Sequence, residues 1–218
     1  GETWRTSDAP PERFVGTPRM TSPATWRAGS RGERAMCQWQ TTVQALVPDA
    51  ERWTLDTAEH GRLSQRYRAV LLAVPAPQAQ PLLSAVAPSG AALAGGARMR
   101  ASWAVMVRCP APVALPCEGA FINAGPLRWV ARDSSKPGRT GPETWLLHAS
   151  AQWSEAHLED DAAAVTQQML AAFTELGGPR PEHVQATAHR WRFADTEPAL
   201  TVGHWWDADA SLGLCGDW

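Results

Sequence analysis

The chain has 218 residues, 44% of them hydrophobic and 19% charged, and its net charge at pH 7 is −2. It is long enough to fold around a sizeable core, as one large or two small domains. A balanced charge gives no basic field to hold a phosphate backbone, so we do not expect nucleic acid as a partner. A membrane is not expected either, because no apolar run approaches the roughly 20 residues that span a bilayer.

The N-terminal sequence and the cysteines bear on where the protein works. GETWRTSDAPPER lacks the apolar centre of a signal peptide, and the first residue is not Met, so we expect a cytoplasmic protein and a piece of a longer chain. The cysteines are Cys37, Cys109, Cys117 and Cys215, without a CxxC pair, so no metal site is expected. A disulfide between Cys109 and Cys117 is an alternative to the reduced thiols that we favour.

The first half of the chain predicts short strands and one helix. Residues 1–30 are rich in Pro, Thr and Arg without periodicity, which indicates a loop. Strands are expected at Thr41–Leu46, Arg52–Leu55, Tyr67–Val74 and Ala101–Arg108. Pro75 ends the third strand, because proline cannot donate to a ladder, and a short helix follows at Gln78–Val86. The small residues at 87–96 fit either a helix or a loop.

The second half predicts more strands around one long helix. A hairpin joins Ala120–Asn123 to Leu127–Arg132. Further strands are expected at Trp145–Ala149, Gln185–Phe193, Thr201–Trp206 and Leu212–Cys215. The helix, at 160–176, has apolar residues at helical spacing, acidic residues at its start and Gly177 and Gly178 at its end. The sum is an α+β fold with a mostly antiparallel sheet.

Tryptophan is over-represented, with 12 Trp against 1 Tyr and 4 Phe. Many of these side chains belong in a core, but we expect some to line a groove or pocket, where they would suit a planar ligand. On the strand His189–Phe193, alternation places His189, Trp191 and Phe193 on one face and both arginines on the other. Two interpretations stay open. The strand has one apolar and one basic face as part of an ordinary sheet, or it forms a ligand-binding surface whose rings stack on a ligand and whose arginines bind an anionic group.

Short motifs add little. The sequence contains no GxSxG, HExxH, GxGxxG or P-loop, so no catalytic, zinc or nucleotide motif stands by itself. Lys136 and Arg139, in the Gly- and Pro-rich loop Ser134–Pro142, are either a phosphate site or solvated cations. Glu159–Asp161 is either a cation site or, as we favour, a solvated helix start. No catalytic residue can be named from these patterns.

Several strings together resemble one family. They are VLLAVPAPQA (70–79), ARMRASWAVM (97–106), SSKPGR (134–139), WLLHAS (145–150), WS (153–154), HLE (157–159), AHRWRFA (188–194) and CGDW (215–218). Their residues, order and spacing resemble the renalase-like branch of the FAD-dependent amine oxidase superfamily. The resemblance is strong from Val70 to the end and weak over Phe14–Leu55.

The resemblance implies a fold that is incomplete at both ends. The family opens with a strand–GxGxxG–helix unit that holds the FAD pyrophosphate, and it continues beyond Gly-Asp-Trp with a closing helix; neither is present in this sequence. Arg19 stands where the family usually has glycine, and residues 21–40 match poorly. We therefore expect a partial FAD-binding segment at 1–75, a substrate domain at 76–200, and a truncated return to the FAD-binding domain at 201–218.

The resemblance also implies site residues. The cofactor would meet the backbone of Val43, the strand end at Ala73 and Pro75, and the residues Gly216, Asp217 and Trp218. Facing the flavin, the substrate would meet Trp129, His148, Arg190 and Trp191. Tryptophans would supply stacking, and Arg190 or Arg192 would supply charge.

The activity implied is an FAD-dependent oxidation. A reduced, nitrogen-containing small molecule, nicotinamide-like or an amine, would give a hydride to the flavin, and oxygen would then take the electrons to give hydrogen peroxide. An NAD(P)-derived nucleotide is accordingly a candidate partner. The alternative is a non-catalytic, Trp-lined binding domain, or an inactive fragment that does not hold FAD.

Overall fold

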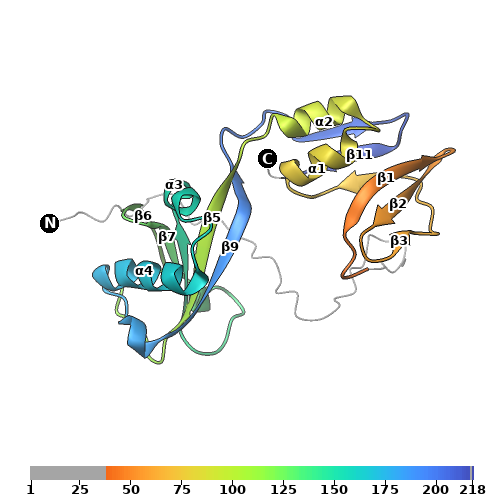
Figure 1. Cartoon of the computed structure of the whole chain (residues 1–218). Coiled ribbons are helices and arrows are strands. Elements are labelled where there is room, and N and C mark those ends of the chain that lie inside the picture. The colour runs from red at the N-terminus through yellow and green to blue at the C-terminus, as the bar shows by residue number, and fades with distance from the viewer. Residues whose placement is uncertain (1–37, 217) are drawn as a thin grey trace. The chain divides into compact units, whose positions relative to one another are not determined.

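The computed structural model describes residues 38–216 and 218 of the chain (Figure 1). The chain divides into two compact units, Gly1–Arg68 and Ala69–Trp218. The strands pair mostly antiparallel and are accompanied by a few helices, which confirms the α+β fold. The loop predicted for residues 1–30 lies outside the described residues, and the domain boundaries predicted after residues 75 and 200 stay predictions.

The first unit carries a three-stranded antiparallel meander. Its strands are β1 (Val43–Asp49), β2 (Arg52–Thr57) and β3 (Gly61–Arg62), in the order β1-β2-β3. A tight turn joins β1 to β2, and Ala50 in that turn has a φ of 54°, in the left-handed region that such hairpins require. Trp53 on β2 is 5% exposed and forms the centre of this small sheet.

Tyr67 belongs to the meander, and the strand predicted at Tyr67–Val74 is therefore too long. The Tyr67 N–H donates to the Trp53 carbonyl and its carbonyl accepts from the Trp53 N–H, both at 2.8 Å. These bonds use the Tyr67 backbone in the first unit. The strand that follows, β4, covers Val70–Leu72 alone and lies in the second unit.

The second unit contains a five-stranded antiparallel sheet. Its strands are β5 (Met99–Arg108), β6 (Gly119–Ala124), β7 (Leu127–Arg132), β8 (Thr144–Ala149) and β9 (Gln185–Thr196). They lie in the order β6-β7-β8-β5-β9, so β9, last in sequence, pairs with β5, the first. Two helices, α3 (Ala151–Ala156) and α4 (Ala162–Glu175), lie on one side of this sheet (Figure 1). Short 3₁₀ turns stand at Asp133–Ser135 and Pro181–His183.

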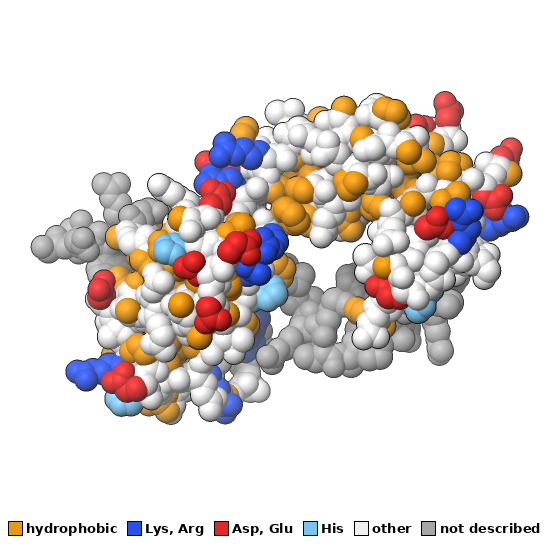
Figure 2. All heavy atoms as spheres, in the orientation of Figure 1, with side chains coloured by type: hydrophobic (Ala, Val, Ile, Leu, Met, Phe, Trp, Pro, Cys, Tyr) orange, Lys and Arg blue, Asp and Glu red, His pale blue; other side chains and the backbone are white. Residues whose placement is uncertain are grey.

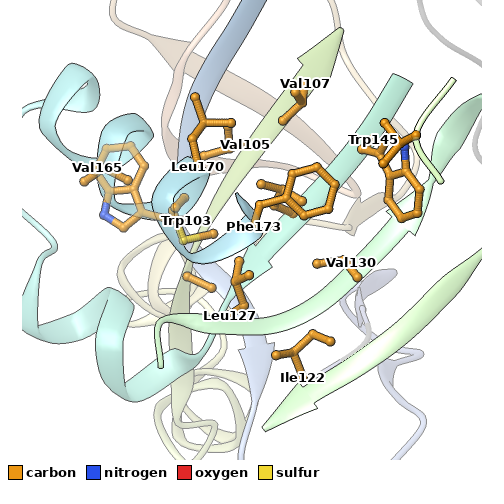
Figure 3. Packing of buried hydrophobic residues seen from close by; sticks show 14 of the residues in the cluster. Trp103, Val105, Val107, Ile122, Leu127, Val130, Trp145, Val165, Leu170 and Phe173 are labelled. Carbon is orange, nitrogen blue, oxygen red and sulfur yellow. The ribbon is translucent and has the colours of Figure 1, made fainter. Parts of the chain in front are cut away.

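The main core lies between α4 and the sheet (Figure 3). Val105, Leu147 and Phe173 are 0% exposed there. The Phe173 ring packs against the Trp145 ring, with 5.4 Å between ring centroids. Because alternate residues of a strand point to opposite faces, this core fixes which residues of each strand face away from the helices.

Helix α4 begins two residues after the predicted start because Asp161 is its N-cap. The Asp161 carboxylate accepts hydrogen bonds from the backbone N–H groups of Ala163, at 2.9 Å, and Ala164, at 3.4 Å. This satisfies donors that the first helical turn leaves unpaired. At the other end, Gly177 has a φ of 99°, a conformation that favours glycine, and it ends the helix where the sequence predicts.

A second, smaller sheet completes the unit. It consists of β10 (His204–Asp207), β11 (Leu212–Cys215) and β4, with β11 and β4 parallel. Helices α1 (Ala76–Leu83) and α2 (Pro88–Gly95) accompany it, so the stretch left open between helix and loop is helical. A Cβ on Gly90 would lie 3.0 Å from the Trp205 ring, so α2 packs closely on β10.

Three further predictions concern thiols, metals and membranes. Cys109, Cys117 and Cys215 are free thiols, so the Cys109–Cys117 disulfide is absent, while Cys37 lies outside the described residues. Burial raises the pKa of Cys109 to about 11, with a smaller contribution from Glu143. Among the described residues, no group of His, Cys, Asp and Glu is placed to hold a metal ion, and no helix is long and apolar enough to cross a membrane.

Candidate functional site

One row of side chains crosses all five strands on the face that points away from α4. Cross-strand pairing places these residues side by side: Phe121 on β6, Trp129 on β7, His148 on β8, Ala104 on β5 and His189 on β9. Each has a sequence neighbour in the main core, such as Val130, Leu147 or Val105, so the row itself faces the other way. Ser102 on β5 pairs with Trp191 on β9, which adds Trp191 to this face.

We call Phe121, Trp129, His148, His189 and Trp191 the aromatic face. Phe121 is 69% exposed and Trp191 52% exposed, which is high for such large apolar rings. The rings also contact each other: Phe121 and Trp129 are 4.6 Å apart between centroids, and His189 and Trp191 are 4.5 Å apart. A row of partly exposed rings offers π-faces on which a planar molecule can stack.

Gly119 supports this arrangement. A Cβ at Gly119 would lie 2.8 Å from the ring of Trp129, a distance that real Cβ atoms do not adopt. Glycine at this position therefore lets the Trp129 indole lie close over β6, against Phe121. A larger residue at position 119 would displace the indole.

His148 is the half-buried centre of the row, and its surroundings favour the neutral form by lowering its pKa. Burial lowers the pKa of His148, and the nearby positive charges of Arg128 and Lys136 lower it further. Both cations have carboxylate partners, since Arg128 donates to Asp195 at 2.9 Å and Lys136 to Asp133 at 2.9 Å. The middle of the aromatic face is thus an uncharged imidazole with cations close by.

Arg190 lies on the opposite face from Trp129, His148 and Trp191, so the prediction that these four side chains share one face is wrong for Arg190. Its guanidinium donates to Glu159 at 2.9 Å and lies 5.6 Å from the centroid of the Trp103 ring, in the helix-covered layer. Arg192 also donates to Glu159, at 2.7 and 3.0 Å. Both arginines are engaged by this one carboxylate and do not supply charge to the aromatic face.

The other charged candidates also have partners. Lys136 and Arg139 both pair with Asp133, which neutralises part of the loop proposed for phosphate. Of the acidic run, Glu159 holds the two arginines, Asp160 contacts His157, and Asp161 caps α4. The charges on the view in Figure 2 are correspondingly mixed, with acidic and basic side chains next to each other.

The residues predicted for the cofactor gather partly at one end of the small sheet. The strands β4 and β11 run parallel, and their last paired residues are Leu72 and Leu214. Ala73 and Gly216 therefore come after the ends of these two strands, at the same edge of the small sheet. Pro75 stands there as the residue before α1. In open α/β sheets this edge, at the carboxyl ends of parallel strands, is where ligands bind.

Trp218 closes this edge. Its indole N–H donates to the carbonyl of Val74 at 3.2 Å, and the side chain is 9% exposed. A Cβ on Gly216 would collide with the Trp218 indole, so an alanine there would displace the indole. A shallow cleft beside it is lined by Gly203, His204, Trp205, Cys215, Gly216 and Trp218, among others. Asp217 lies outside the described residues.

Val43 lies in the first unit, at the start of β1. It is half-buried, and β1 is an edge strand of the described meander, so one side of its backbone is not used by β2. A bulge between Val43 and Ala45 interrupts the pairing with β2 at this point. A free strand edge could offer its backbone to a ligand, so the adenine contact of Val43 stays a prediction.

Sequence reasoning did not name Phe121 as a site residue. The predicted hairpin, with its loop at Ala124–Pro126, already places Phe121 opposite Trp129, and the structure has this pairing. The observed loop after Ala124 is one residue shorter, and a register shift between Phe121 and Ala124 keeps Phe121 on the same face as Trp129. The signal that could have found Phe121 is its place opposite Trp129 in this hairpin.

The comparisons with known proteins concern the fold. No protein-family model matches the chain. A protein assigned as a protoporphyrinogen oxidase from Exiguobacterium sp. has a similar structure (TM-score 0.61, 18% identity, 81% of this chain and 41% of that chain). An oxidoreductase from Methanosarcina mazei is also similar (TM-score 0.53, 12% identity, 81% of this chain and 43% of that chain). So is cyclohexylamine oxidase from Brevibacterium oxydans (TM-score 0.50, 15% identity, 82% of this chain and 42% of that chain). This chain spans about two-fifths of the length of these structures, and over that part it has the fold of oxidases of this kind.

Proposed function

We propose that this chain is part of a flavin-dependent oxidoreductase that binds FAD and oxidises a reduced, planar, nitrogen-containing small molecule. The observation that carries the proposal is the aromatic face, a row of partly exposed rings on the side of the five-stranded sheet that points away from α4. The family resemblance of the sequence and the similarity to solved oxidases support it.

The residues present fit parts of an FAD site. The strand ends at Ala73 and Gly216 would bring backbone groups to the cofactor, and Pro75 would start α1 beside it. Gly216 has no side chain, which allows close approach to its backbone, although the Trp218 indole already occupies one side. Asp217 and the Val43 backbone are further candidates. When bound, the flavin would accept a hydride from the substrate and pass two electrons to oxygen, which gives hydrogen peroxide.

The chain's own part in such a reaction is to bind and orient the substrate ring. Trp129 and Trp191 would stack on it, and the sheet would hold these rings in fixed register. A hydride transfer from an electron-rich ring needs no protein base, in agreement with a face that presents a neutral imidazole and aromatic rings.

The charges around the face favour a nicotinamide-like substrate over an alkylamine. Asp195 is the one carboxylate within the five described strands of this sheet, and it is held by Arg128. Arg128 and Lys136 act on the centre of the face. A protonated amine would find no unpaired carboxylate within these strands, because Asp195 is paired with Arg128, whereas a neutral ring needs none.

The test of the flavin assignment is the visible absorption spectrum of the purified chain after incubation with FAD and removal of free cofactor. A retained flavin spectrum supports the proposal. A matched pair of variants locates the site: Gly216→Ala displaces Trp218, whereas Gly203→Ala, in the same cleft, adds a Cβ with nothing within 4 Å. We expect the first variant to lose flavin and the second to keep it. A colourless wild-type chain would contradict the proposal for this chain.

The exposed rings also fit a second function, a non-catalytic module that binds planar ligands. Phe121 and Trp191 are exposed enough to stack with a ligand without any cofactor. A chain that binds a planar nucleotide but retains no FAD would favour this second function.

A further inference from the structure

We propose that His148, as a neutral imidazole, is the residue that hydrogen-bonds to the polar edge of the planar ligand, so that binding at the aromatic face is lost when His148 takes up a proton. The inference rests on the proposed function, because it assumes that a planar ligand stacks on this face. It adds a residue that sets ligand orientation and specificity.

The first support is position. His148 lies on β8, the middle strand of the sheet, and its neighbours in the row are Trp129 on β7 and Ala104 on β5. Ala104 is 3% exposed, so the neighbour of His148 in the row that remains partly exposed is Trp129. A ring stacked on Trp129 would bring its edge to His148.

The second support is unused hydrogen-bonding capacity. No hydrogen bond joins the His148 ring to another described residue, and the half-buried side chain lies on the face of the sheet that points away from α4. His157, by contrast, has its Nδ1 2.7 Å from Asp160 and its ring stacked on Trp153. A neutral imidazole offers one donor and one acceptor, and an unpaired imidazole at the centre of a binding face is available to a ligand.

The third support is the charge around the ring. The titratable groups near it are Arg128 on β7, Lys136 with its partner Asp133 in the loop after β7, and His189 and Asp195 on β9. The facing positions of β5, at Ser102, Ala104 and Met106, carry no charge. Burial, Arg128 and Lys136 all lower the pKa of His148, so the neutral form persists below the ordinary histidine value of about 6.5.

Protonation would change both the charge and the hydrogen-bonding pattern of the site. It would add a third positive charge beside Arg128 and Lys136, and it would turn the ring's acceptor nitrogen into a donor. A ligand edge that donates an N–H to His148 would then lose its partner. Binding should therefore be intact at neutral pH and fall as the pH drops through the lowered pKa.

The experiment is a fluorescence titration of the full chain with tetrahydronicotinamide adenine dinucleotide, a redox-inert analogue of a reduced nicotinamide nucleotide. Quenching of the intrinsic tryptophan fluorescence reports binding between about pH 5 and pH 8. For the wild type we expect affinity to fall on acidification with a midpoint below about 6.5. His148→Phe keeps a ring but removes the polar edge, so it should bind about tenfold more weakly at neutral pH and lose the pH dependence.

Two further variants separate a direct role from a structural one. Lys136→Met removes one of the charges that lower the pKa of His148, so the midpoint should move to higher pH. His183→Phe changes an exposed histidine outside the face and should keep the wild-type profile. The inference is overturned if His148→Phe keeps the wild-type pH profile, or if the wild type does not bind the analogue at any pH. Flavin retention is measured separately, so a failure of the flavin assignment is distinguishable.

Discussion

His148 and Trp129 are direct cross-strand partners on β8 and β7, and both point away from the helix-covered core. Cross-strand partners on one face have their Cβ atoms roughly 4.5–5.5 Å apart, close enough for one ligand to touch both. A polar imidazole and a large indole therefore form a single binding element, with a stacking surface beside a hydrogen-bonding group. The predictions for this face depend on that pairing.

Replacing Trp191 should weaken binding at the aromatic face. Loss of a stacking ring typically costs about 1–3 kcal/mol of binding free energy. We therefore expect Trp191→Ala to lower kcat/KM, or the affinity for a planar ligand, by the factor that corresponds to this free energy. Trp206→Ala is a matched control, because Trp206 is 47% exposed, close to the 52% of Trp191, but lies on the small sheet. Equal effects of the two variants would remove Trp191 from the site.

Among the carboxylates in the region of the five-stranded sheet, Glu143 should contribute most to the free energy of unfolding. Its Oε1 accepts from Arg132 at 2.6 Å and from the Trp145 indole at 2.8 Å, and Arg132 also donates to the carbonyls of Val113 and Leu115. The side chains of Arg132 and Glu143 are 18% and 12% exposed. Glu143→Ala leaves a largely buried cation unpaired, so we expect the free energy of unfolding to fall by about 3 kcal/mol.

Denaturant titration measures this change, and Asp195→Ala provides the comparison. The Arg128–Asp195 pair is half exposed on both sides, and such pairs contribute about 0–1 kcal/mol. A Glu143→Ala variant that is no less stable than Asp195→Ala would show that the Arg132 network does not hold the connector at 113–115.

The pKa of Glu159 should depend on Arg192. Hydrogen bonds from Arg192 lower the pKa of Glu159, with a smaller effect of Arg190. A carboxyl group with a folded pKa below its unfolded value of about 4.3 stabilises the fold above that value, and this contribution is lost as the pH falls through the folded pKa. In Arg192→Gln we therefore expect the pKa of Glu159 to rise towards the ordinary value.

Carboxyl titration by NMR resolves this prediction, and Glu155 serves as an internal reference. The pKa of Glu155 is lowered mainly by a hydrogen bond from Arg100, on β5, so it should stay the same in Arg192→Gln. An unchanged Glu159 pKa in that variant would contradict the pairing of Glu159 with Arg192.

Sequence periodicity predicted the elements that are determined by residues close together in the sequence. The helix α4 follows from apolar spacing, from Asp161 and from the glycines at its end, all of which act within a few residues. The division of β9 into a face with His189 and Trp191 and a face with Arg190 and Arg192 also follows from alternation alone, and the pairing of β9 with β5 agrees with it.

The site itself depends on contacts between distant segments, which periodicity does not contain. Which face of β9 meets the helices is decided by its pairing with β5, and Glu159 binds both arginines from a segment about 30 residues earlier in the chain. The strand at 67–74 was predicted too long because the Tyr67 backbone pairs with Trp53.

Flavin chemistry at the aromatic face is tested by anaerobic mixing of the FAD-incubated chain with reduced nicotinamide mononucleotide, and separately with cyclohexylamine, while the visible flavin absorption is followed. We predict that the flavin band disappears with the dihydronicotinamide and persists with the amine, because Asp195, the one carboxylate within the five described strands, is already paired with Arg128 and does not hold a cation. Admission of oxygen should then restore the band. A chain that holds flavin but is reduced by the amine alone, or one that holds no flavin, would contradict this prediction.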